Sequence, residues 1–67
     1  MVDKNRNLVL ALMDNRLTQR ELGKRSGVHE TRISLMVNGR LVPSKSEAAR
    51  IAKELRREPF ELFREVA

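Results

Sequence analysis

The 67-residue sequence has no cysteine, tryptophan or tyrosine, and it has two phenylalanines. The lack of cysteine excludes disulfides, cysteine nucleophiles and thiolate metal sites, and nothing marks an oxidising compartment. The scarcity of aromatic rings leaves almost no platform for the stacking of unpaired bases, which readers of single strands and many RNA readers require. If the protein binds nucleic acid, duplex DNA is therefore favoured.

Long hydrophobic runs are also missing. The longest apolar stretch, Leu8 to Met13, is far shorter than the roughly 20 residues that span a bilayer. The charged start MVDKNRN does not resemble a signal peptide. We therefore expect a soluble cytoplasmic protein that does not bind membranes, with residues 1–67 forming one small domain.

Side chains suited to catalysis or metal binding are few. His29 is the single histidine, so a metal site built on a histidine pair is excluded, and we expect no metal and no cofactor. A hydrolytic site would need Ser26 or Ser34 activated within two short helical segments, without an oxyanion hole or a substrate pocket. We therefore expect that the protein is not an enzyme.

Positive charge is in excess, with fourteen Lys and Arg against nine Asp and Glu and a net charge of +5. A basic balance in a small domain favours a polyanionic partner. The apolar residues recur at helical spacing throughout, without the alternation of a strand, so we predict an all-α fold of five helices.

The first predicted helix runs from Asp3, as N-cap, to about Asp14, with Asn15 in the left-handed position after it. Its apolar face is expected to contain Leu8, Val9, Leu12 and Met13. The second helix opens with a capping box, Thr18 and Glu21, and is closed by Ser26 and Gly27. It contains Gly23, although glycine in a helix costs roughly 1 kcal/mol against alanine.

The third predicted helix spans residues 30–37, is capped by His29, and ends at Asn38 and Gly39. A second capping box, Ser44 and Glu47, opens the fourth helix, and Pro59 begins a short fifth helix. The core face of the fourth helix is expected to consist of Ala48, Ile51, Ala52 and Leu55. The fifth carries Phe60, Leu62, Phe63 and Val66.

Two short helices joined by a turn with glycine are typical of a helix-turn-helix, in which the first helix crosses above the second. This crossing needs a small residue, so we expect the two helices to approach so closely at Gly23 that a larger side chain would not fit. The segments LTQREL, GVHETRIS, NGR, PSKSEAARIAKEL and PFELF occur in the order and at the separations of a known family. The sequence resembles the lambda-repressor-like, Cro/Xre-type helix-turn-helix family.

The resemblance implies a compact five-helix domain of a bacterium or phage, acting at the nucleoid, with the helix-turn-helix formed by helices two and three. The sequence departs from the family at Gly23, where alanine is usual, at Ser26, where an apolar residue is usual, and at His29, where serine or threonine is usual. The family commonly buries an arginine–glutamate pair where this chain has Leu12 and Val37. We expect a hydrophobic contact in place of that ion pair.

The resemblance also implies the DNA contacts. Base edges are expected to be read from the third helix by Glu30, Thr31 and Leu35, which match the base-reading positions of the family. Arg32 is added to this set because it is expected on the same exposed surface. Arginine suits guanine, glutamate suits cytosine, and methyl groups suit thymine. For Leu35 a place in the core is the alternative, and for Glu30 the alternative is a carboxylate that complements the helix dipole.

The DNA backbone is expected to be bound by polar residues at the start of helix two, after helix three and at the start of helix four. This set consists of Gln19, Arg20, Asn38, Arg40 and Lys45. Such contacts set position and affinity but do not select a sequence. For the residues on short helices, an ordinary solvated face is the alternative.

The fifth helix is more apolar than one small core requires, which favours a homodimer through Phe60, Phe63 and Val66. The alternative is that these side chains complete the monomer core. We expect a sequence-specific transcriptional regulator of duplex DNA, a repressor that acts as a dimer on a near-palindromic operator. An antitoxin-type repressor is a narrower version of this function, and a protein-interaction module with the same fold is the competing hypothesis.

Overall fold

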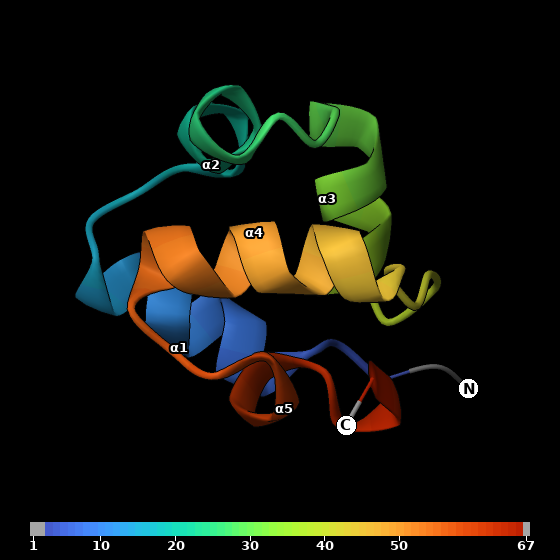
Figure 1. The fold of residues 1–67 in the computed structure, drawn as a ribbon. Helices are drawn as coiled ribbons and strands as arrows, with labels where there is room; N and C mark the ends of the chain where they lie inside the picture. The colour runs from blue at the N-terminus through green and yellow to red at the C-terminus, as the bar shows by residue number, and fades with distance from the viewer. Residues whose placement is uncertain (1–2, 67) are drawn as a thin grey trace.

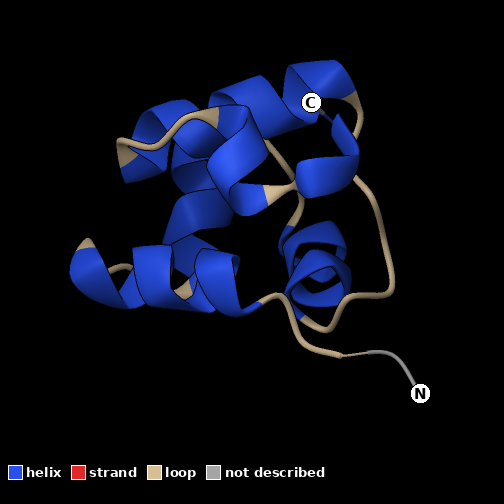
Figure 2. Ribbon diagram, turned by 90° about the horizontal axis from the view of Figure 1, so that it is seen from below, coloured by secondary structure: helices blue, strands red, loops and turns tan. Residues whose placement is uncertain are grey.

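The chain folds into helices joined by short loops, as Figures 1 and 2 show. A computed structural model describes residues 3–66, and this part of the chain contains helices but no strand. The elements are α1 (Arg6–Asp14), α2 (Gln19–Ser26), α3 (Glu30–Val37), α4 (Lys45–Leu55), α5 (Pro59–Leu62) and the 3₁₀ helix η1 (Arg64–Val66). The prediction of an all-α fold with five α-helices is confirmed.

One apolar core lies between the helices. In Figure 1, α4 runs through the middle of the molecule, with α2 on one side of it and α1 and α5 on the other. The core consists of Leu8, Ala11, Leu12, Leu22, Val28, Ile33, Met36, Val37, Ala48, Ile51, Ala52, Leu55, Leu62 and Phe63. None of the helices within residues 3–66 has the length and apolar character needed to cross a membrane.

Helix α1 begins later than the sequence suggests. Its N-cap is Asn5 and not Asp3, because the Asn5 side-chain oxygen accepts the Leu8 backbone N–H at 3.0 Å. The Asn5 backbone N–H also donates to the Val37 carbonyl at 2.8 Å, and its side-chain amide donates to the Leu62 carbonyl at 2.7 Å. Asn5 therefore ties α1 to α3 and α5 through partners that are remote in sequence.

The end and the buried face of α1 also differ from the prediction. Arg16, with φ of 54°, takes the left-handed position, whereas Asn15 has φ of −92° and donates its side-chain amide to the Ala11 and Leu55 carbonyls. Met13 is 67% exposed, and Ala11 occupies the core in its place. The turn after the helix thus follows from the bond between Asn15 and the end of α4.

Both predicted capping boxes are present. At α2 the Thr18 hydroxyl accepts the Glu21 N–H, and the Glu21 carboxylate accepts the Thr18 N–H. Ser44 and Glu47 make the same pair of bonds at α4. Each box satisfies two backbone N–H groups that helix geometry leaves free, which fixes where α2 and α4 begin.

Gly23 lies where α2 meets the turn and the start of α3. A Cβ built on Gly23 would lie 2.9 Å from the Val28 carbonyl oxygen and 3.4 Å from the Glu30 backbone nitrogen. These atoms belong to the backbone and cannot rotate away as the end of a side chain can. The close approach expected at Gly23 is therefore confirmed.

We expect Gly23→Ala to destabilise the protein, although alanine is the better helix former. Overpacking against fixed neighbours costs about 1–3 kcal/mol, and the gain in helix propensity returns only about 1 kcal/mol. The predicted net loss, about 1 kcal/mol, is measured by urea unfolding, with Lys24→Ala at an exposed position of the same helix as control. A Gly23→Ala variant more stable than the wild type would contradict the close approach.

The end of α5 closes the core. Leu62 and Phe63 are 3% and 2% exposed, and Phe63 leaves the helix in an extended conformation, with φ of −135°. The prediction that Phe63 faces a second copy is therefore wrong, since its ring is buried within the monomer. Phe60 is 57% exposed. Val66 ends η1, and its side chain lies outside what the structure describes.

Candidate nucleic-acid interface

Helix α3 lies beside α2 at one end of the molecule (Figure 1). One side of α3 packs into the core, and the other side is exposed to solvent. Ile33 and Met36 hold it to the core, at 0% and 1% exposure. Glu30, Thr31 and Leu35 are exposed, and Leu35 has 39% of its surface accessible. The helix-turn-helix geometry is confirmed, and the alternative that Leu35 belongs to the core is excluded.

The chain changes direction sharply in the turn between α2 and α3, residues 27–29. Gly27 ends α2 in the left-handed region, with φ of 75°, which a residue with a Cβ adopts only with strain. Ser26, the buried polar residue of the described chain, donates its hydroxyl to the Leu22 carbonyl at 2.7 Å. His29 then caps α3, its Nδ1 accepting the Thr31 N–H at 3.0 Å. These contacts fix the direction of α3 relative to α2.

Arg32 is not free at the surface of α3. Its Nε donates to one carboxylate oxygen of Glu47 at 2.7 Å, and its Nη2 donates to the other at 2.8 Å. The Arg32 side chain is 46% exposed, whereas that of Glu47 is 13% exposed. The predicted base reader is therefore paired with α4 in the protein without DNA.

Hydrogen bonds to the Glu47 carboxylate favour its charged form. The Arg32 guanidinium, followed by the Ser44 backbone N–H, lowers the pKa of Glu47 from 4.5 to about 2. The same pairing raises the pKa of Arg32 above its ordinary value. Both groups remain ionised at every pH near neutrality, so the charges of the ion pair between α3 and α4 are present throughout that range.

The predicted phosphate-binding residues lie at helix ends. Gln19 is the first residue of α2, and Arg20 follows it with an exposed side chain; Arg40 is exposed after α3, and Lys45 is exposed at the start of α4. Asn38 is half-buried, and its side-chain amide donates to the Ser34 carbonyl at 2.9 Å. The Asn38 side-chain oxygen can therefore accept a hydrogen bond from a ligand, while its side-chain NH₂ group is already bonded to Ser34.

The structure gives the positions of Arg57 and Arg50, two basic residues whose surroundings the sequence does not predict. Arg57 donates to the Asp14 carboxylate at 2.7 Å, which ties the segment after α4 to the end of α1. An Nη atom of Arg50 lies 3.3 Å from the position of a Cβ on Gly27. Arg50 thus lies beside the turn between α2 and α3, which its sequence spacing from that turn does not reveal.

Comparison with protein families decides the classification. A helix-turn-helix family model, HTH_3, matches residues 11–62. The chain belongs to this family. A search of curated proteins finds no match.

Solved structures of the same fold include proteins of different size. The restriction-modification controller protein C.AhdI from Aeromonas hydrophila is 25% identical, with a TM-score of 0.79, over 88% of this chain and 89% of its own. The hypothetical transcription factor NHTF from Neisseria is 23% identical, with a TM-score of 0.76, over 85% of this chain and 66% of its own.

The fold also occurs within a larger chain. Streptomyces albus HEPD, solved with its substrate 2-hydroxyethylphosphonate and Fe(II), is 23% identical with a TM-score of 0.78, over 91% of this chain but 14% of its own. Fold alone therefore does not assign a function. The family membership, together with the regulator-like neighbours, supports a DNA-binding transcriptional regulator.

Proposed function

We propose that the protein is a sequence-specific regulator of transcription that represses by occupying duplex DNA as a homodimer on a near-palindromic operator. The observation that carries this proposal is the division of α3 into an anchored side and an exposed side. Ile33 and Met36 are held in the core, while Glu30, Thr31 and Leu35 are accessible. This is the arrangement that a helix needs in order to enter the major groove without loss of the fold.

The exposed residues of α3 offer chemistry that matches base edges. Glu30 can accept a hydrogen bond from cytosine N4, and the methyl groups of Thr31 and Leu35 can contact the thymine methyl. The net charge of +5 supports the approach to a polyanion. Glu30 in this role lies in the first turn, where its charge also complements the helix dipole.

Phosphate binding is assigned to Gln19, Arg20, Asn38, Arg40 and Lys45. Arg20, Arg40 and Lys45 bring positive charge and exposed side chains. Gln19 and Asn38 are half-buried and bring polar groups at the edge of the helix-turn-helix. These contacts orient α3 on the duplex and account for sequence-independent affinity.

A protein-interaction module is the competing function. Interfaces between proteins are typically anchored by Trp, Tyr, Phe or Arg in their centre. Helix α3 carries no aromatic residue, and its arginine is bound to Glu47. The exposed side of α3 therefore fits DNA better than a protein partner.

Equilibrium binding separates these functions. Fluorescence anisotropy would compare a pool of labelled duplexes with single strands of the same composition. The proposal predicts preference for the duplex, because few aromatic rings are available for stacking on unpaired bases. Equal binding to both forms, or to neither, would contradict it.

Thr31→Ala and Leu35→Ala are expected to change specificity at near-normal stability. Each lost base contact should cost roughly 1–3 kcal/mol on the preferred operator and little on random DNA, because the phosphate contacts remain. Binding selection on randomised duplexes should show relaxed preference at one or two base pairs per half-site. Lys24→Ala, on the exposed face of α2, serves as the control. A variant that weakens all sequences equally would not be a base reader.

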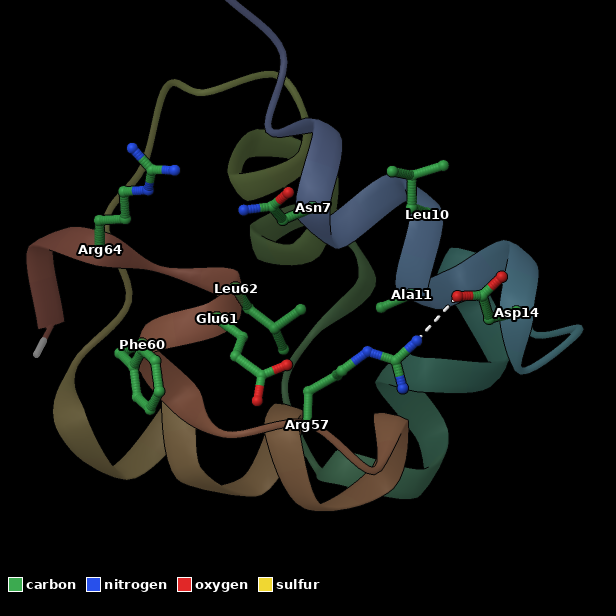
Figure 3. Close-up of a pocket in the computed structure, with 9 residues that line it drawn as sticks. All are labelled: Asn7, Leu10, Ala11, Asp14, Arg57, Phe60, Glu61, Leu62 and Arg64. Atoms are coloured by element: carbon green, nitrogen blue, oxygen red, sulfur yellow. Dashed lines mark hydrogen bonds and ion pairs between the residues drawn. The ribbon is translucent and has the colours of Figure 1, made fainter.

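The surface between α1 and α5 is the one that we assign to the homodimer. A groove of about 430 Å³ lies there, and Figure 3 shows Leu10 and Phe60 on opposite sides of it, with Arg57 bound to Asp14 at one end. Leu10 is 54% exposed and Phe60 is 57% exposed. A two-fold interface must be complementary to itself, and apolar side chains at the edge of a groove meet this condition.

Phe60→Arg is expected to weaken the dimer without unfolding the monomer, since Phe60 lies outside the core. Sedimentation should show a shift toward monomer, and affinity for a full operator should fall toward that for a half-site. Val42→Arg is the matched control, because Val42 is 54% exposed but does not line this groove. Unchanged sedimentation of Phe60→Arg would place the dimer contact elsewhere.

A further inference from the structure

The ion pair between Arg32 and Glu47 connects the recognition helix to the fourth helix. Both donors of the guanidinium edge are used, at 2.7 Å and 2.8 Å, so the pair has the bidentate geometry that fixes orientation as well as distance. Among residues 3–66 there are two ion pairs, and this is the one that involves α3. Helix α3 is thus held by apolar residues on one side and by Arg32 at its edge.

Glu47 is a rigid partner for Arg32. Its oxygen Oε1 also accepts the Ser44 backbone N–H at 3.0 Å, and its own backbone N–H donates to the Ser44 hydroxyl at 3.1 Å. Helix α4, which carries Glu47, is anchored by Ala48 and Ile51, both at 0% exposure. A guanidinium bound to this carboxylate is therefore tied to a helix that is itself anchored in the core.

Release of Arg32 toward DNA would leave Glu47 without its neutralising partner. Glu47 lies two residues from Lys45, at the end of α4 to which we assign a phosphate contact. An unpaired carboxylate near phosphates is repelled by them. Retention of the pair keeps this part of the interface free of uncompensated negative charge.

We propose that Arg32 is a positioning residue and not a base reader: its guanidinium stays on Glu47 when α3 enters the major groove and holds Glu30, Thr31 and Leu35 in register. This inference rests on the proposed DNA-binding function and refines it. It changes the set of base readers expected from the sequence by removing Arg32. It also gives Glu47, which the sequence marks as a capping residue, a second role in binding.

The test measures the ratio of affinities for the selected operator and a scrambled duplex. Because a positioning pair acts as a unit, Arg32→Ala and Glu47→Gln should each lower this ratio by a similar factor, about two- to tenfold. The double variant should be no worse than either single variant. The selected motif should keep the same preferred base at every position. Glu54→Gln, with the same change of charge on the same helix, is the control and should leave the ratio unchanged.

Opposite behaviour of the two variants would overturn the inference. If Arg32 read a base and Glu47 merely restrained it, Glu47→Gln would raise the ratio, while Arg32→Ala would lower it and relax one base position. An Arg32 Nε–H resonance that moves away from its free-state position on DNA binding would contradict retention of the pair. We expect that resonance to be unchanged in the complex.

Exchange of the two charges gives a second readout, in which recovery is expected for a positioning arginine but not for a base-reading arginine. Arg32→Glu combined with Glu47→Arg rebuilds the pair in reverse and should recover most of the ratio lost in Arg32→Glu alone. A base-reading arginine would not be rescued, because residue 32 would still carry a carboxylate. Absence of duplex preference in the wild type would overturn the proposed function together with the inference. Normal wild-type preference without rescue would overturn the positioning role alone.

Discussion

Val37→Glu should lower the free energy of unfolding by about 3 kcal/mol or more, because it places an unpaired charge in the core. Val37 is 6% exposed at the end of α3. It belongs to the same apolar cluster as Leu12, which is also 6% exposed and lies on α1. Leu35→Glu, on the exposed side of the same helix, is the matched control and should change stability little.

A double-mutant cycle tests whether these two positions are in contact. Leu12→Arg alone should also be strongly destabilising, whereas Leu12→Arg with Val37→Glu should recover part of the loss by forming the ion pair of the related proteins. Urea unfolding of the two single variants and the double variant gives the coupling energy. Strictly additive losses would show that Leu12 and Val37 are not neighbours.

Duplex affinity should fall by about 10³ between 50 mM and 200 mM salt, because each neutralised phosphate releases counterions. Arg20, Arg40 and Lys45 supply three cationic contacts in each copy. For a dimer, the expected slope of log affinity against log salt is about −5. Titrations of one duplex at several salt concentrations measure this slope.

Single substitutions show which residues contact phosphates, because each lost contact makes the dependence of affinity on salt less steep. In the dimer, Arg40→Ala removes one phosphate contact from each copy, so it should reduce the magnitude of the slope by about two and should weaken all sequences alike. Lys53→Ala is the control, since Lys53 is exposed near the far end of α4 and lies outside the proposed set. A salt response that stays flat in the wild type would contradict the assignment of these residues.

Local chemistry made much of the fold predictable. The Thr18–Glu21 and Ser44–Glu47 boxes and the left-handed Gly27 define where helices begin and end through bonds between neighbours in sequence. The start of α1 could not be found in this way. Asn5 outcompetes Asp3 as cap because it also binds Val37 and Leu62, which are brought close only by the tertiary fold.

In the candidate site, too, some positions follow from the local sequence and others depend on tertiary contacts. The positions of Ile33 and Met36 follow from helical spacing, but the exposure of Leu35 depends on how far the neighbouring helices reach around α3. The bond between Arg32 and Glu47 spans fifteen residues and has no signature in the linear pattern. Phe63 is buried because the chain leaves its helical path after Leu62, which a regular apolar spacing cannot reveal.

Binding selection from a pool of randomised duplexes tests most directly whether α3 reads the DNA sequence. The wild type would be compared with a variant in which Glu30, Thr31 and Leu35 are all replaced by alanine. The wild type should enrich one motif with inverted-repeat symmetry. The variant should still bind duplex DNA with a similar dependence on salt but should enrich no motif. Enrichment of the same motif by both proteins, or of no motif by the wild type, would contradict sequence reading by α3.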